Sequence, residues 1–226
     1  MAHSSQPGTA FRAATFARET SPGYRHPHVP ARPLHGRVRR PHSARDRSGL
    51  MARRVESFAP ASRADARVLV LGSMPGEASL RAGEYYAHAR NHFWPFMGEL
   101  VGAVPQMPYV ARLSRLHDAG VALWDVLQQC ERSGSLDSAI VGQTARPNDF
   151  AAFLGRHPGI RWVLFNGARA ESDFLRLQAP VIGRFGLACR RLPSTSPANA
   201  SQRREDKLRE WREALRRAGA SLVGEG

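Results

Sequence analysis

The sequence predicts an α/β fold: a three-layer α/β/α domain around a central, mostly parallel, four-stranded sheet. Four short apolar runs recur between residues 67 and 192, and each is followed by glycine or polar residues. Such runs are typical of parallel strands that are buried on both faces. Segments with helical spacing separate the runs, and strands that alternate with helices form a sheet covered by helices on both sides.

The predicted elements follow one another in a regular order. The strands are expected at residues 67–72, 120–124, 160–165 and 187–192. Helices are expected at about 91–103, 109–118, 147–156 and 168–177, with a last helix at about 200–218. That last helix carries Leu208, Trp211 and Leu215 on one stripe, which indicates a helix that buries one face and exposes the other.

Residues 1–50 have a different composition from the rest. They contain nine arginines but only two acidic residues, a net charge of +7, and they show no helical or strand period. We expect this segment to be a disordered basic tail, followed by a catalytic domain at residues 51–226. Three interpretations of the tail stay open: a basic arm that binds phosphates, a targeting peptide, or a stretch that is not translated because synthesis begins at Met51.

Composition limits the class of partner. The chain has a net charge of +14, which favours a polyanion, although an arginine-rich composition alone would produce the same balance. Cys130 and Cys189 form no CxxC pair, so we expect no metal, no iron–sulfur cluster and no other cofactor. No long apolar run is present, so we expect no membrane partner and a cytoplasmic location.

Glycine or polar residues follow all four predicted strands. They are residues 72–76, Asp125, residues 166–167 and residues 194–199. Ligands of open α/β sheets bind beyond the carboxyl ends of the strands, so these four segments are expected to meet at one binding rim.

The first of these segments leads into an aromatic stretch. Residues 72–76 read GSMPG, which matches neither the GxxxxGK[ST] phosphate loop nor GxGxxG, so a nucleotide cofactor is disfavoured. Residues 84–94 are dense in tyrosine, histidine, phenylalanine and tryptophan, whose rings can stack on nucleobases. The alternative is that Phe93 and Trp94 only begin the next helix, with Asn91 as its N-cap.

Five motifs together resemble one protein family. The segments at residues 72–76, 85–94, 123–127, 134–138 and 194–199 are similar to the hypoxanthine-DNA glycosylase branch of the uracil-DNA glycosylase superfamily. The similarity covers about residues 65–220. It implies a monofunctional enzyme that flips a deaminated base out of DNA and hydrolyses its glycosidic bond, with hypoxanthine favoured and uracil as the alternative.

The resemblance also implies roles for individual residues. Met74 stands where mismatch-type relatives have an asparagine that positions water, and in the hypoxanthine branch this role passes to Asn91. Phe93 matches the ring that stacks on the flipped base, and residues 194–199 match the segment that fills the gap in the duplex. The expected set is: catalytic Asn91 and Asp125; base-binding Gly72, Ser73, Met74, Tyr86, Phe93 and Asn166; DNA-binding His88, Arg90, Ser194, Ser196, Pro197 and Asn199.

Asp125 has a chemical rationale for base selection. A carboxylate accepts a hydrogen bond from N1–H of hypoxanthine but repels the N1 lone pair of adenine, whereas uracil also offers an N–H. Asp125 could instead cap the following helix, and Asn199 could cap the last one. The one lysine, Lys207, lies on the last predicted helix, so a Schiff-base lyase is disfavoured.

The expected partner is DNA that contains a deaminated base, bound by a monomer. Two other functions stay open: a non-catalytic nucleic-acid sensor, and a hydrolase that acts on free nucleosides.

Overall fold

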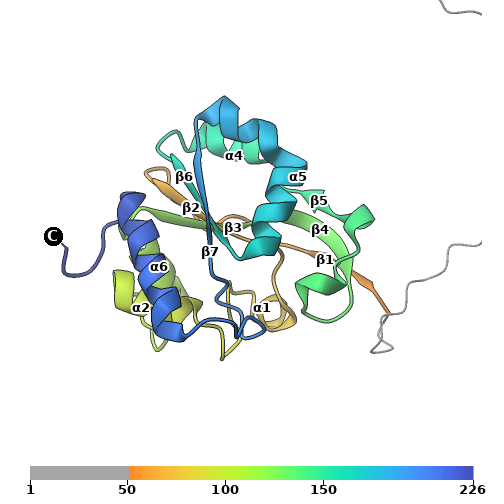
Figure 1. The fold of residues 1–226 in the computed structure, drawn as a ribbon, viewed down its shortest axis with the longest axis horizontal. Helices are drawn as coiled ribbons and strands as arrows, with labels where there is room; N and C mark the ends of the chain where they lie inside the picture. Colours follow the sequence, from red (N-terminus) through yellow and green to blue (C-terminus); the bar gives the residue numbers. More distant parts are fainter. Residues whose placement is uncertain (1–50, 226) are drawn as a thin grey trace, which may run out of the picture. The chain divides into compact units, whose positions relative to one another are not determined.

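A computed structural model describes residues 51–225, and the predicted tail at residues 1–50 lies outside this range. The centre of the described part is a four-stranded sheet in the order β3-β2-β6-β7, with every neighbouring pair parallel (Figure 1). Its strands are β2 (Val68–Gly72), β3 (Val121–Asp125), β6 (Trp162–Asn166) and β7 (Ala188–Leu192). The predicted fold class and all four predicted strands are therefore confirmed.

Helices cover both faces of this sheet because side chains alternate along each strand. Leu69 and Leu71 of β2 pack into one core cluster and Val68 and Val70 into the other. The first cluster includes side chains of α4 (Phe150–Arg156) and α5 (Ala168–Phe185); the second includes side chains of α2 (Phe93–Val101), α3 (Tyr109–Asp118) and α6 (Arg204–Arg217). Figure 1 shows α4 and α5 on one side of the sheet and α2 and α6 on the other.

The helices differ from the prediction in one missed helix and in several boundaries. A short helix, α1 (Glu77–Ala82), was not predicted. Helix α5 continues through Pro180 to Phe185, because one proline removes a single helical hydrogen bond and Gly186, in the left-handed region, then ends the helix. The N-cap of α6 is Arg203, so the interpretation of Asn199 as the cap of this helix is wrong.

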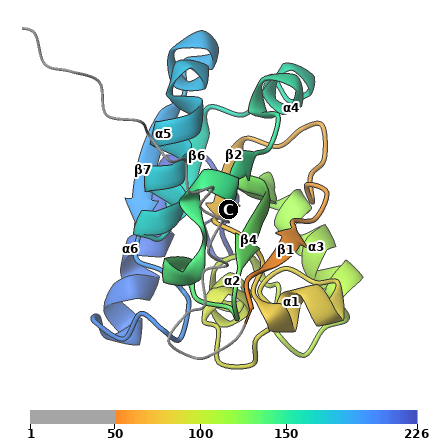
Figure 2. The same cartoon turned by 90° about the vertical axis from the view of Figure 1, so that its right-hand side faces the viewer.

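A second, antiparallel sheet was also missed. It has the order β1-β4-β5 and consists of β1 (Arg53–Glu56), β4 (Leu127–Arg132) and β5 (Arg146–Pro147). Figure 2 shows β1 beside β4. Only Val126 separates the end of β3 from the start of β4, so the chain passes directly from one sheet into the other. Two 3-10 turns, η1 (Asp137–Ala139) and η2 (Gly142–Thr144), follow β4.

The junction between the sheets lies at the carboxyl end of β2. The backbone N–H groups of Val126 and Leu127 donate to the carbonyl oxygens of Gly72 and Ser73 at 2.8 and 3.1 Å. These bonds hold the start of β4 against the rim where a ligand is expected. No helix of residues 51–225 is long and apolar enough to cross a membrane.

Candidate active site

A cavity of about 690 Å³ opens at the carboxyl ends of the parallel strands. This volume is in the range of pockets that enclose a small organic ligand. Thirteen of the fourteen residues predicted for the site line it: Gly72, Ser73, Met74, Tyr86, His88, Arg90, Asn91, Asp125, Asn166, Ser194, Ser196, Pro197 and Asn199. The prediction that the four strand ends meet at one rim is confirmed.

Phe93 is the exception. It is the first residue of α2, is 0% exposed and packs in the core. Tyr86 stacks on it with ring centroids 4.0 Å apart and lies between Phe93 and the cavity. The expectation that Phe93 touches the flipped base is therefore wrong for this structure, because Tyr86 covers it. The interpretation of Phe93 as the start of a helix is correct.

The floor of the cavity is formed where β2 and β3 end side by side. Gly72 pairs with Asp125 in the parallel register. A Cβ atom on Gly72 would lie 2.5 Å from Asp125 Oδ1 and 3.3 Å from the Tyr86 hydroxyl. Glycine is thus required at this position to make room for the two side chains of the floor, a reason that the sequence did not reveal.

Asp125 is only 3% exposed, and its Oδ2 has no hydrogen-bond partner within residues 51–225. Burial raises the pKa of Asp125 to about 8; the nearby Asp137 carboxyl also raises it, while Arg132 lowers it. At neutral pH the side chain is therefore mostly a neutral acid that can both donate and accept a hydrogen bond. The interpretation of Asp125 as a helix cap is wrong, since β4 follows it.

Asn91 is held by the turn before α2. Its backbone N–H donates to His88 O at 2.8 Å, and its side-chain Oδ1 accepts from Phe93 N at 2.9 Å. The N-cap of α2 is His92, so the interpretation of Asn91 as the N-cap is wrong by one position, although the Asn91 oxygen binds the first backbone N–H of the helix. The amide Nδ2 is the remaining polar group of this side chain, and it can only donate.

The segment of residues 194–199 is anchored at its base and exposed at Pro197 and Ala198. Thr195 exchanges two hydrogen bonds of 2.9 Å with the side chain of Asn166. Lys207 is 2% exposed, and its Nζ donates to Ser194 O at 3.0 Å and also to Asn199 O. Asn166 was predicted to contact the base; it lines the cavity, but both polar atoms of its amide already bind Thr195.

Two charged residues of the site had been given no role from the sequence. Asp137 of η1 lines the cavity, and Ser73 Oγ donates to its Oδ1 at 2.6 Å. Arg132 of β4 is fully buried, and its Nη2 donates to Pro75 O at 2.6 Å. The signal that could have identified Asp137 was the motif at residues 134–138, which belongs to the resemblance but follows a strand that the sequence did not predict.

Neither histidine of the aromatic stretch points to a metal. His88 is exposed at the rim, and its Nδ1 accepts from Arg90 N at 3.1 Å. His92 has a lowered pKa, first because of burial and then because of the Lys207 and Arg204 charges. Within residues 51–225 no cluster of three or more histidine, cysteine or acidic residues could hold a metal ion.

Comparisons with known proteins show the family of the chain. The model of the uracil DNA glycosylase superfamily matches residues 59–218. A hypoxanthine DNA glycosylase of Methanosarcina barkeri is 32% identical over 165 residues, which cover 72% of this chain and 98% of the relative. A hypoxanthine DNA glycosylase of Methanosarcina acetivorans is 34% identical over 152 residues, which cover 66% of this chain and 90% of the relative.

A solved structure shows the same fold. The solution NMR structure of a protein from Methanosarcina acetivorans, described as a candidate uracil DNA glycosylase, superimposes with a TM-score of 0.61 at 29% identity. The match covers 74% of this chain and 99% of the other chain.

Proposed function

The chain belongs to the uracil-DNA glycosylase superfamily, and we propose that it excises hypoxanthine from DNA as a monofunctional N-glycosylase. The observation that carries this proposal is the cavity at the carboxyl ends of the sheet, with the neutral acid Asp125 at its floor. The names of the two Methanosarcina relatives support hypoxanthine as the base. Uracil is the alternative substrate.

The reaction needs donors for the leaving base. Breaking the N-glycosidic bond leaves positive charge on the sugar and negative charge on the base, so prearranged hydrogen-bond donors lower the barrier. Asn91 Nδ2 and the backbone N–H groups at Gly72–Met74 supply donors at the cavity wall, and we assign Asn91 a catalytic role on this ground.

Asp125 reads the edge of the base. As a neutral acid it accepts from N1–H of hypoxanthine and donates to O6, so it matches both groups of this edge. The neutral form can also pair with adenine, whereas the ionised form repels the N1 lone pair of adenine. Rejection of adenine should therefore improve as the pH rises through about 8.

The remaining lining residues hold the nucleotide and its duplex. Tyr86, supported from behind by Phe93, replaces Phe93 as the ring that stacks on the base. His88 and Arg90 contact the DNA backbone, and Ser194, Ser196, Pro197 and Asn199 enter the gap that the flipped nucleotide leaves. The enzyme acts as a monomer in the cytoplasm, at the nucleoid, and residues 51–226 are its catalytic domain.

An excision assay tests the proposal. Oligonucleotides that contain hypoxanthine, uracil or xanthine, each single-stranded and double-stranded, are incubated with the protein, and released base is measured. We expect hypoxanthine to be released fastest, Asn91→Ala to bind DNA without excision, and Asp125→Ala to release hypoxanthine more slowly and with less selectivity. Release of no base from any oligonucleotide would contradict the proposal and favour a sensor, while hydrolysis of free deoxyinosine alone would favour a nucleoside hydrolase.

A further inference from the structure

One group that hydrolysis requires is still unassigned: an acceptor for the proton of the attacking water. Met74 occupies the position where mismatch-type relatives place a water-binding amide, and a thioether is only a weak acceptor. Asn91 Oδ1 already accepts from Phe93 N at 2.9 Å, and the Nδ2 of this amide can only donate. The acceptor must therefore come from another part of the cavity wall.

Three carboxylates line the cavity: Glu77, Asp125 and Asp137. Glu77 lies at the start of α1 and forms an ion pair with Arg53 at 3.3 Å. Asp125 is a neutral acid near pH 7 and so has no charge with which to attract a proton. Among the carboxyl groups of the cavity wall, Asp137 is left as the acceptor.

Asp137 is firmly positioned. Ser73 Oγ donates to its Oδ1 at 2.6 Å, and Arg169 Nη1 donates to its backbone carbonyl. Arg169 is in turn held by Asp173, a buried residue of α5, at 2.6 Å. Within residues 51–225 no hydrogen bond to Asp137 Oδ2 is present, so this oxygen can receive a water.

We propose that Asp137 is a catalytic residue that orients the attacking water and accepts its proton. Ser73, the neighbour of Met74, is the positioning residue that holds the carboxylate. This role rests on the proposed glycosylase function. As the water oxygen bonds to C1′, the bond between C1′ and the base breaks, and its electron pair leaves with the base. The water proton passes to Asp137 Oδ2, and the base takes a proton from the Asp125 carboxyl.

The two carboxyl groups thus have opposite roles, and their surroundings support the division. The pKa of Asp137 is also raised, first by burial and further by Asp173, but the hydrogen bond from Ser73 and the Arg169 and Arg132 charges hold this rise back. Around Asp125, only Arg132 opposes the rise caused by burial and by Asp137. Two carboxyl groups with different surroundings are a common way to provide an acid and a base in one site. The rate should therefore depend on pH as a bell, with Asp137 setting the acidic limb.

Single-turnover excision of hypoxanthine from duplex DNA tests the role of Asp137. Loss of a general base typically lowers a rate by about 100-fold or more, so we expect this decrease for Asp137→Asn, with DNA affinity and melting temperature nearly unchanged. The acidic limb of the pH profile should disappear, and formate or azide should partly restore the rate of Asp137→Ala. Asp118→Asn, at the opposite end of the sheet, is the control and should keep the wild-type rate.

Ser73→Ala gives a second, independent readout. The hydrogen bond from Ser73 lowers the pKa of Asp137, so its loss should move the acidic limb to higher pH while part of the activity remains. If Asp137→Asn keeps the wild-type rate and the acidic limb, the role of Asp137 as proton acceptor is wrong, while the glycosylase function still stands. A wild-type protein that releases no base would overturn both.

Discussion

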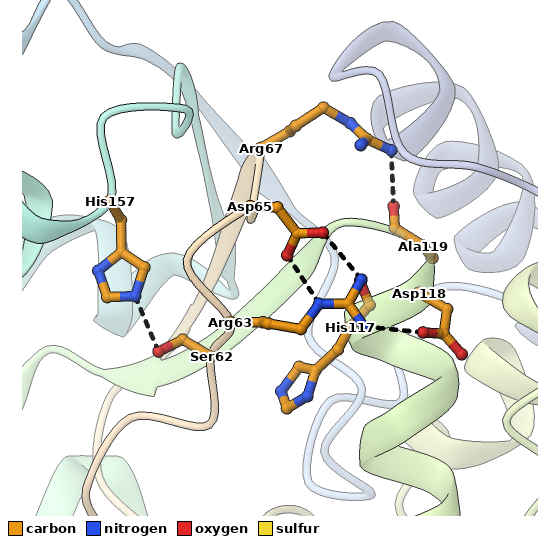
Figure 3. A network of polar contacts seen from close by, with 8 residues as sticks. All are labelled: Ser62, Arg63, Asp65, Arg67, His117, Asp118, Ala119 and His157. Atoms are coloured by element: carbon orange, nitrogen blue, oxygen red, sulfur yellow. Dashed lines mark hydrogen bonds and ion pairs between the residues drawn. The ribbon is translucent and has the colours of Figure 1, made fainter.

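The two ends of the parallel sheet differ in whether their polar side chains have hydrogen-bond partners. At the amino ends of the strands, Arg63 lies between Asp65 and Asp118, with N–O distances of 2.8 to 2.9 Å (Figure 3). Arg67 donates to the carbonyl oxygens of Ala119 and Gly219, and Ser62 pairs with His157. These side chains all have hydrogen-bond or ion-pair partners, and their contacts hold in place the loops that lead into the strands.

At the carboxyl ends, buried polar atoms are left without partners. Within residues 51–225 six buried side-chain atoms lack a hydrogen bond. Five of them belong to Tyr86 and Asp125, which line the cavity, and to His92 and Arg132, which bind the lining residues Thr195 and Pro75. The sixth, Nε2 of His117, lies at the amino ends. Unsatisfied buried groups destabilise a fold, so their concentration at one end indicates that this end is shaped for a ligand rather than for stability.

Among the substitutions that test this difference between the two ends, Gly72→Ala should have the largest effect on excision. The added methyl group would lie 2.5 Å from Asp125 Oδ1, so the floor of the cavity must shift. We expect excision to decrease on the order of 100-fold, since small displacements of reacting groups have effects of this size. Gly155→Ala is the matched control, because nothing lies within 4 Å of its added Cβ in α4. If both variants excise hypoxanthine equally well, the tight floor has no functional meaning.

Asp125→Asn tests whether the carboxyl end is built at the expense of stability. The folded-state pKa of Asp125, about 8, lies above the ordinary value of 3.8, so between these pH values the folded protein binds the extra proton. Wild-type stability should therefore fall as the pH rises through this window, and be lowest above pH 8. The variant has no such slope and should be more stable at pH 9 by about 1 kcal/mol or more. Urea unfolding at pH 6 and pH 9 measures the difference; a parallel pH dependence of the two proteins would count against it.

Lys207→Met tests whether the segment of residues 194–199 acts in duplex binding rather than in cleavage of the glycosidic bond. Lys207 is the one lysine among 33 basic residues, and its ammonium group binds carbonyls at both ends of this segment. Without it we expect excision from duplex DNA to fall by about 10-fold, the effect of losing 1.4 kcal/mol of interaction. Excision from single strands should change little, because no duplex gap has to be filled. Arg209→Met, on the exposed side of α6, is the control; an equal loss on both substrates would assign Lys207 to general stability.

The smallest effect is expected at the amino ends. Arg63→Ala removes exposed ion pairs with Asp65 and Asp118, and exposed pairs contribute little to stability. We expect a slightly lower melting temperature, with less difference in high salt, and an unchanged excision rate. A clear loss of excision would show that the two ends are coupled.

Much of the fold was predictable because it follows from local patterns. The buried strands are continuous apolar runs, and the helix at residues 109–118 was predicted with its observed bounds. The antiparallel sheet was not predictable in this way: β1 and β4 are mostly polar, and they pair across more than seventy residues. The sequence predicted that Phe93 stacks on the base, but Tyr86 packs over its ring and leaves Phe93 in the core. The position of Tyr86 depends on tertiary packing and could not be predicted from the local pattern.

The sequence by itself determined the layers of the fold, the family and the rim at which the site lies, since hydrophobic periodicity and strand-end motifs are local properties. Only the tertiary structure decided what each side chain does there. It placed Tyr86 over Phe93, made Asp125 a neutral acid and brought Asp137 to Ser73 across 64 positions. These outcomes depend on burial and on contacts between distant segments, which no local pattern of residues records.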